Sequence, residues 1–286
     1  MNTQFWVIQV FNGVSYGALL FLVGSGLSLI FGVMRIVNLS HGSYFMLGGY
    51  IALSVINATG SWALSIPLAA LAVAVIGMLM ERVFLRPLGF DPLRQVLLTV
   101  GFAFLFQQAA LDIWGGNNMD ITPPAVLTRS IVIGGVYLPT YRMFMIGMAL
   151  AIGLALWLVI EKTRVGAAVR ATVDDAQMAR GVGIDTNRIS MFIFALGAFL
   201  AAVGGVIGGA FLGVFPGLDF EMLPLAFAVV IIGGMGSLGG AAIGALLVGL
   251  ADNFGKALFP EISYFTLYAP MVLILAIKPT GLFGRE

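Results

Sequence analysis

Long apolar segments separated by short charged ones dominate the pattern of this chain. Residues 1–34 carry no charged side chain, and residues 36–80 carry none either. A helix of about 20 apolar residues crosses the hydrocarbon core of a membrane. We therefore predict helical spans over the apolar stretches 5–34, 40–57, 62–80, 96–111, 143–160, 189–214 and 262–277.

The remaining apolar stretch, 222–251, is rich in glycine and too short for two full spans. If it crossed once, the basic tail with Lys278 and Arg285 would lie on the opposite side from the other basic loops. Two half-helices that meet at residues 233–240 would instead return the chain, and irregular backbone at membrane depth is tolerated where protein buries it. We therefore predict a broken or re-entrant helix pair here.

Basic residues gather in two of the loops. Loop 81–95 contains three arginines, and loop 161–188 contains Lys162, Arg164, Arg170, Arg180 and Arg188. Because cytoplasmic loops carry the excess of Lys and Arg, we predict that both loops are cytoplasmic and that the amino terminus is outside. The predicted fold is an all-α polytopic transmembrane bundle of about eight membrane elements. It forms a single transmembrane domain over residues 1–286.

Composition agrees with a membrane protein and excludes several classes of function. Of the 286 residues, 60% are hydrophobic and 9% are charged, against about 25% charged in soluble domains. The 14 basic and 13 acidic residues nearly cancel, so no bulk field attracts nucleic acid. The chain has no cysteine and a single histidine, His41. We therefore expect no disulfide, no metal site and no catalytic constellation.

Small residues at a spacing of four follow the predicted span 189–214. Positions 197, 201, 205, 209, 213 and 217 are all Gly or Ala. In lipid, such ridges let helix backbones approach closely. We therefore interpret two sets of glycines as helix-packing positions rather than a ligand site: Gly205, Gly209 and Gly213, and then Gly236, Gly240 and Gly244.

Polar residues inside the apolar pattern are candidates for a translocation path: Asn38, Ser40, His41, Tyr44, Gln107 and Gln108. The run 35–42 separates two apolar segments, so its side chains could line the inner end of a path or brace a helix start. Ser40 could equally cap the second span through its hydroxyl. The two glutamines lie in the fourth span, where an amide must face protein or water rather than lipid.

The segment 161–188 is longer than a connection between two helices needs. Helical structure is plausible from Gly166 to Gly181, with one charged face and one face rich in alanine. A solvated loop would explain the basic residues but not the alanine-rich face. A partner protein that holds the segment as a helix in a groove would make use of that face.

Two stretches of sequence are more specific than a generic membrane protein. The first is GLSLIFGVMRIVNLSHG at 26–42, followed by Gly48-Gly49-Tyr50. The second is TRVGAAVRA at 163–171, followed by Asp174, Asp175, Ala176, Ala179, Gly181 and Ile184. Both resemble LivH-type permeases of branched-chain amino-acid ABC importers. The stretches GGMGSLGG at 233–240 and KPTGLFG at 278–284 also fit.

The resemblance implies a permease subunit of the bacterial cytoplasmic (inner) membrane that carries amino acids. It implies a LivM-type permease, two cytoplasmic ATPase subunits and an extracytoplasmic solute-binding protein as partners. It also implies an ATPase contact made by Thr163, Arg164, Gly166, Arg170, Asp174, Asp175, Ala176, Ala179, Gly181 and Ile184. The chain has no Gly-x4-Gly-Lys-[Ser/Thr] phosphate loop. ATP and Mg²⁺ are therefore expected on the partner ATPases, and no enzyme activity is expected here.

The alternative is a secondary transporter or channel for a small solute. Such proteins usually show midplane charges or inverted repeats, and neither is clear in this sequence. The segment 161–188 would be surplus in such a protein. Branched-chain or other neutral amino acids lead as solutes on resemblance. Urea, short amides and aromatic acids travel through similar permeases, so the solute stays open among these classes.

Overall fold

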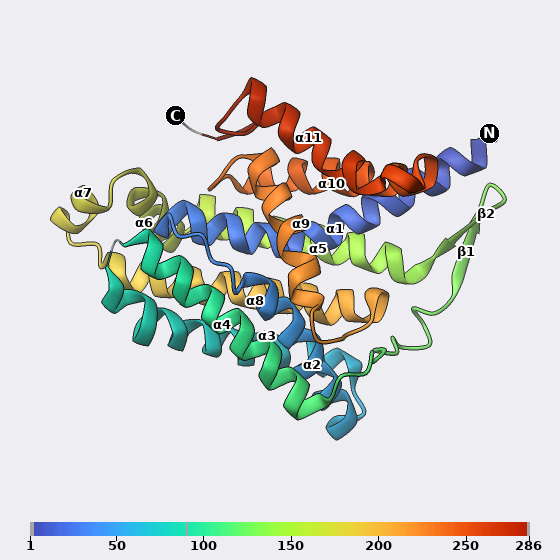
Figure 1. The fold of residues 1–286 in the computed structure, drawn as a ribbon, viewed down its shortest axis with the longest axis horizontal. Helices are drawn as coiled ribbons and strands as arrows, with labels where there is room; N and C mark the ends of the chain where they lie inside the picture. The colour runs from blue at the N-terminus through green and yellow to red at the C-terminus, as the bar shows by residue number, and fades with distance from the viewer. Residues whose placement is uncertain (1–2, 90, 285–286) are drawn as a thin grey trace.

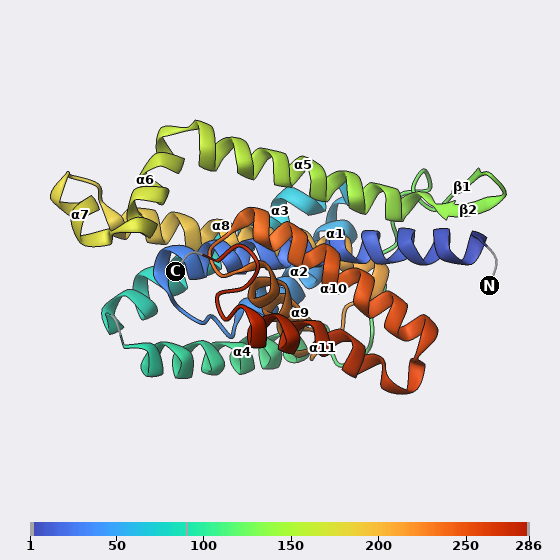
Figure 2. The same ribbon diagram turned by 90° about the horizontal axis from the view of Figure 1, so that it is seen from above.

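The computed structural model describes residues 3–89 and 91–284, and it is an elongated helical bundle (Figures 1 and 2). Its α-helices are α1 (Thr3–Met34), α2 (His41–Thr59), α3 (Trp62–Met80), α4 (Pro92–Trp114), α5 (Thr140–Lys162), α6 (Arg164–Asp174), α7 (Ala176–Gly181), α8 (Thr186–Leu212), α9 (Leu218–Gly233), α10 (Leu238–Leu258) and α11 (Ser263–Ile277). The α3 helix continues through a π-helical turn, Glu81–Leu85, and a 3-10 turn, Arg86–Leu88. A further 3-10 turn, Pro260–Ile262, precedes α11.

Six helices of the described chain are long and apolar enough to cross a membrane: α1, α3 with its extension, α4, α5, α8 and α10. The most apolar windows of α1 and α8 are 72% and 78% buried, against 22% and 17% for α4 and α5. Lipid tails are as apolar as Leu, so the exposed apolar faces of α4 and α5 suit contact with the bilayer. The chain is therefore a multi-pass helical membrane protein with α1 and α8 at its centre, which confirms the predicted fold class.

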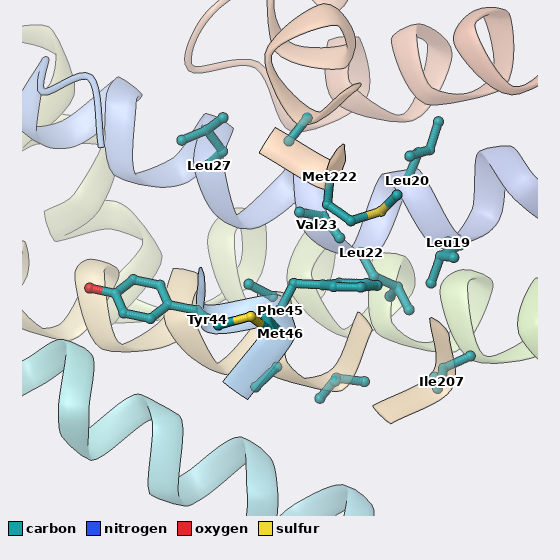
Figure 3. Packing of buried hydrophobic residues seen from close by; sticks show 14 of the residues in the cluster. Leu19, Leu20, Leu22, Val23, Leu27, Tyr44, Phe45, Met46, Ile207 and Met222 are labelled. Carbon is teal, nitrogen blue, oxygen red and sulfur yellow. The ribbon is translucent and has the colours of Figure 1, made fainter. Parts of the chain in front are cut away.

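The α2 helix packs inside the bundle, against both α1 and α8. Figure 3 shows Phe45 pointing toward Leu19 and Leu22 of α1, whereas the neighbouring Tyr44 points the opposite way. All four side chains are buried. Gly204 and Gly208 of α8 present no side chain toward the Phe45 ring, and this lets α2 and α8 approach closely.

The predicted helix pair is present as α9 and α10, with wider bounds than the apolar stretch suggested. The α9 helix has 16 residues and α10 has 21. They are joined by a turn in which Gly234 and Gly236 have φ of 102° and 82°. This turn lies where the sequence predicted the break. Because the second helix extends to Leu258, α10 is long enough to cross the membrane by itself, and only α9 has the length of a partial span.

The described part of the carboxyl-terminal tail lies at the same end of the bundle as α6 and α7, and α1 begins at the other end (Figures 1 and 2). The Leu282 N–H donates to the Ile232 carbonyl and the Phe283 N–H to the Gly233 carbonyl, both at 3.0 Å. The tail is thereby fastened to the end of α9. This arrangement agrees with the prediction that the tail and loop 161–188 lie on one side.

A β-hairpin extends from the opposite end of the bundle (Figure 1). Strands β1 (Ser130–Ile133) and β2 (Val136–Pro139) pair antiparallel, with Ser130 opposite Pro139 and Ile133 opposite Val136. The sequence analysis predicted no structure for residues 112–142, which lie between the predicted spans 96–111 and 143–160. The hairpin leads directly into α5, which begins at Thr140.

Candidate functional site

Residues 35–40 form an irregular segment that enters the bundle between α1 and α2 (Figure 1). It begins at Arg35, whose φ is 54°, and its Asn38 and Ser40 are fully buried. Irregular backbone at this depth must find partners within the protein. The Leu39 N–H donates to the Thr99 hydroxyl of α4 at 3.2 Å, and the Ser40 N–H donates to Asn38 Oδ1 at 3.1 Å.

The first turn of α2 continues this segment and bonds to three other helices. The Nε2 atom of His41 lies 3.0 Å from the Val23 carbonyl of α1; a carbonyl can only accept, so Nε2 carries the proton. The Ser43 hydroxyl donates to Asp219 Oδ2 of α9 at 2.9 Å. The Tyr44 hydroxyl lies 2.9 Å from Met80 Sδ of α3. We call the buried group the polar cluster: Asn38, Ser40, His41, Ser43, Tyr44 and Asp219.

Asp219 is the acidic member of the polar cluster. The sequence analysis missed it, because residue 219 lies between the apolar stretches 189–214 and 222–251. The structure places Asp219 in the first turn of α9, where only 3% of it is exposed. A buried carboxylate is costly unless it is hydrogen-bonded, and Ser43 supplies one such bond. A signal was available, because acidic residues just after Gly217 are typical of a helix start.

Three polar atoms of the cluster have no hydrogen-bond partner within residues 3–89 and 91–284: Asn38 Nδ2, His41 Nδ1 and Asp219 Oδ1. Buried polar atoms are normally paired, so unpaired ones can mark a place for water or a ligand. The amide offers a donor, whereas the carboxylate and a neutral imidazole offer acceptors. A carboxylate and an ammonium group could use these atoms. The cluster is closed to solvent in this structure.

The other predicted path residues, Gln107 and Gln108, lie outside the polar cluster and have different surroundings. Gln107 is half-buried beside Gly217, at the start of α9. Gln108 is exposed, and its side-chain amide donates to Asp112 at 2.9 Å. The capping alternative for Ser40 is wrong, because its hydroxyl makes no capping bond to α2. That hydroxyl donates to Asn38 Oδ1 at 2.7 Å instead.

The segment 161–188 folds as two short helices whose starts are fixed by side-chain caps. The Thr163 hydroxyl accepts from the Gly166 N–H at 3.1 Å at the start of α6. Asp175 interrupts the helix that the sequence predicted as continuous to Gly181, and its carboxylate caps α7. Arg170 pairs with Glu161 at 3.5 Å and donates to the Ile160 carbonyl. These bonds hold α6 against the end of α5.

The predicted coupling residues divide between an inner and an outer face. Ala179 is buried, and its carbonyl accepts from the Ile184 N–H at 3.0 Å; Ala176 and Ile184 are half-buried. Five members are exposed: Thr163, Arg164, Asp174, Asp175 and Gly181. Sequence reasoning missed two apolar neighbours, Met178 and Val182, which are 68% and 74% exposed. They lie at the tip of the molecule that α7 forms (Figure 1).

We expect that Asp175→Ala will loosen α7 without unfolding the membrane helices. Losing an N-cap costs about 1 kcal/mol, and the Asp175 carboxylate accepts from the N–H groups of Gln177 and Met178 at 2.8 and 2.9 Å. Hydrogen exchange of residues 176–181 should therefore quicken, whereas Gln177→Ala should leave it near the parent rate. Equal protection in the two variants would contradict the capping role.

Some of the predicted packing glycines lie against the backbone of a neighbouring helix, and others lie in turns or at a helix end. A Cβ on Gly205 would overlap the Phe45 carbonyl of α2, and one on Gly209 would lie 2.7 Å from Val214. Gly240 and Gly244 face the backbone of α9. Gly236 lies in the turn before α10, where a Cβ would come within 3.0 Å of the Gly32 Cα of α1. One position differs from the prediction, because Gly213 lies beyond the end of α8 with φ 80°. The ridge therefore ends at Gly209.

Comparison with known proteins gives the family. A family model described as "Branched-chain amino acid transport system / permease component" matches residues 9–275. The chain belongs to this family. The permease is 32% identical to the high-affinity branched-chain amino acid transport system permease protein BraD of Pseudomonas aeruginosa, over 97% of this chain and 95% of that protein.

Two further relatives extend the comparison. The permease is 30% identical to LivH of Salmonella typhimurium over 100% of this chain and 98% of that one. It is 27% identical to LivM of the same organism over 91% and 67%. No solved structure gives a significant match. The resemblance to LivH-type permeases, drawn from the stretches at 26–50 and 163–184, is confirmed over nearly the whole chain.

Proposed function

We propose that this permease is a membrane subunit of an ATP-driven importer of branched-chain or related neutral amino acids. It would share the translocation path with a LivM-type permease in the bacterial cytoplasmic membrane. An extracytoplasmic binding protein would deliver the solute. ATP and Mg²⁺ would be bound by two cytoplasmic ATPase subunits rather than by this chain.

The observation that carries this proposal is the exposed apolar tip of α7. Apolar side chains that protrude together from a polar, basic segment favour a protein partner. Met178 and Val182 are the most exposed large apolar residues of the segment 161–188. Their position beyond the ends of the spanning helices suits a cytoplasmic partner (Figure 1).

Contacts behind α7 connect it with the centre of the bundle. The Arg180 guanidinium donates to the Thr186 hydroxyl at 2.7 Å, and Thr186 is the first residue of α8. The α8 helix in turn packs against α2 through Gly205 and Phe45. A push on α7 by a closing ATPase pair would therefore reach α2, which carries three of the six residues of the polar cluster: His41, Ser43 and Tyr44. This is the route we propose for coupling.

A secondary transporter remains the second candidate, because Asp219 is a buried carboxylate in the membrane part of the chain. The two functions differ in their energy source. Uptake of radiolabelled leucine into proteoliposomes should require the partner subunits and ATP if the importer proposal is correct. Uptake by the permease alone, driven by a proton or sodium gradient, would overturn it.

We expect that the double variant Met178→Asp, Val182→Asp will lose co-purification with the ATPase subunits and ATP-driven uptake. A loss of about tenfold or more corresponds to about 1.4 kcal/mol of docking free energy. Val126→Asp is the matched control, because Val126 is also 74% exposed but lies in the segment that leads to the β-hairpin. Both variants should give the parent elution profile. Full uptake by the double variant would show that the tip of α7 takes no part in the coupling contact.

A further inference from the structure

A basic pocket of about 350 Å³ lies between the π-helical end of α3 and the start of α8. Its lining residues are Arg82, Arg86, Asp185, Asn187, Arg188 and Met191. The end of α3 and the start of α8, which line it, are at the end of the bundle where α6 and α7 lie (Figure 1). The proposed function does not use this pocket, and none of its residues belongs to the polar cluster.

The charges around the pocket leave one cation in excess. Arg86 makes two bonds to the buried Glu81 carboxylate, at 3.2 and 2.8 Å, and also donates to the Asn187 carbonyl. Arg188 pairs with Asp185 at 2.9 Å. Arg82 has no carboxylate partner in the described parts of the chain, and it is exposed at the pocket wall. Three guanidinium groups thus face two carboxylates, so the pocket favours an anion.

Phosphate is the anion that this donor set fits best. Guanidinium groups bind phosphate oxygens with paired N–H donors, and Arg82 and Arg188 both have N–H groups to spare beyond the bonds described above. The Asn187 side chain adds an amide to the lining. A bound phosphate would meet donors from both α3 and α8.

The neighbours of the pocket indicate where the phosphate comes from. Val83 and Phe84 follow Arg82 on the π-helical turn, and Phe192 lies one turn after Arg188 on α8. All three are large apolar side chains exposed at the surface. A free phosphate ion would make no use of them, whereas the acyl chains of a lipid would cover them. Basic pockets between helices at the cytoplasmic side of a membrane bind anionic headgroups.

We propose that this pocket binds the phosphate headgroup of an anionic glycerophospholipid from the leaflet on the α6–α7 side. The bound headgroup braces the junction between α3 and α8, because it bonds to arginines of both. Arg86 already joins the two helices by linking Glu81 with Asn187. The lipid therefore stabilises the folded permease against heat.

The test compares the purified permease in nanodiscs of phosphatidylcholine alone and with phosphatidylglycerol added. Phosphatidylglycerol should raise the unfolding temperature of the parent, because a ligand that binds only the folded state stabilises it. Native mass spectrometry should show the lipid retained. Arg82→Gln should weaken retention about tenfold, and Arg82→Lys should restore part of it. Arg94→Gln is the control, because Arg94 is an exposed arginine that pairs with Asp91 outside the pocket.

Three results would overturn the proposal. The first is equal retention of phosphatidylglycerol and phosphatidylcholine, or equal behaviour of Arg82→Gln and Arg94→Gln. The second is full stabilisation by inorganic phosphate in phosphatidylcholine nanodiscs, which would make the ligand a free anion. The third is protection of the pocket only when the ATPase subunits are added, which would make it a protein contact.

Discussion

Replacing Gly205 with valine is expected to prevent the permease from assembling its core. A side chain at this position would overlap the Phe45 carbonyl oxygen and would meet the Gly49 backbone nitrogen at 3.1 Å. Overpacking a core that can yield costs about 1–3 kcal/mol. Here the obstacle is the backbone of α2, which cannot rotate aside as a side chain can. The variant should therefore separate α2 from α8 and lose the folded state.

Gly101→Val provides the matched control, because nothing lies within 4 Å of a Cβ at Gly101 on α4. This control makes the same chemical change in another apolar helix. Size-exclusion profiles and thermal unfolding in detergent should show an aggregated or absent Gly205→Val protein beside a normal Gly101→Val protein. Similar yields and unfolding temperatures would show that α2 and α8 do not need this close approach.

Replacing Asp219 with asparagine is expected to leave the fold intact and to reduce amino-acid uptake sharply. Asparagine is close to isosteric and can still accept the hydrogen bond from Ser43, which is 2.9 Å away in the parent. The change removes the negative charge and the second acceptor oxygen, Oδ1, which lacks a partner among the described residues. A hydrogen bond to a charged group is worth about 1.5–3 kcal/mol. Uptake should therefore fall about tenfold to a hundredfold if the ammonium group of the solute uses this oxygen.

Glu221→Gln is the control for the loss of charge. Glu221 lies in the same first turn of α9 as Asp219 but is exposed. Initial rates of leucine uptake in the assembled importer should fall for Asp219→Asn and stay near the parent for Glu221→Gln. Parent-like uptake by Asp219→Asn, together with parent-like stability, would limit Asp219 to holding Ser43 and the start of α2.

The spanning helices could be predicted where apolar length and local end signals coincide. The predicted span 62–80 matches α3, because Ser61 caps its start through the Leu64 N–H and a charged residue, Glu81, follows its end. The pattern did not reveal that the helix continues as a π-helical turn. In this turn Glu81 is buried, and its carboxylate is paired with Arg86. That continuation depends on a side-chain pair rather than on hydrophobicity.

The packing positions of glycine were predicted correctly in one place and incorrectly or not at all in two others. Gly205 was predicted as a packing position, and it does face the backbone of α2. Gly213 fits the same spacing of four but ends α8 with a positive φ, because glycine serves equally well as a ridge and as a helix end. The pair Gly13 and Gly17, also four apart, was not predicted, yet both contact α10 near Gly249. Only the tertiary fold distinguishes these uses.

The polar cluster was predicted only in part, because some of its members are brought together by the tertiary fold alone. Asn38, Ser40, His41 and Tyr44 stand out because they interrupt an apolar pattern. Asp219 follows a turn and resembles an outer-loop residue, and its partner Ser43 is 176 positions away. The β-hairpin was also not predicted, but unlike Asp219 it has a local signal in the sequence. Gly134-Gly135 stands between two β-branched or aromatic runs, which is typical of a hairpin. Both glycines have positive φ, as the tight turn requires.

The bonds between the tail and α9 have a consequence for the order in which the chain is made. The last carbonyls of a helix need partners from outside it, and at the end of α9 those of Ile232 and Gly233 are satisfied by Leu282 and Phe283. These two residues leave the ribosome only after α10 and α11. During synthesis these two carbonyls of α9 therefore lack their partners within the chain until the tail has been made. The end of α9 is completed only after both downstream helices have been synthesised.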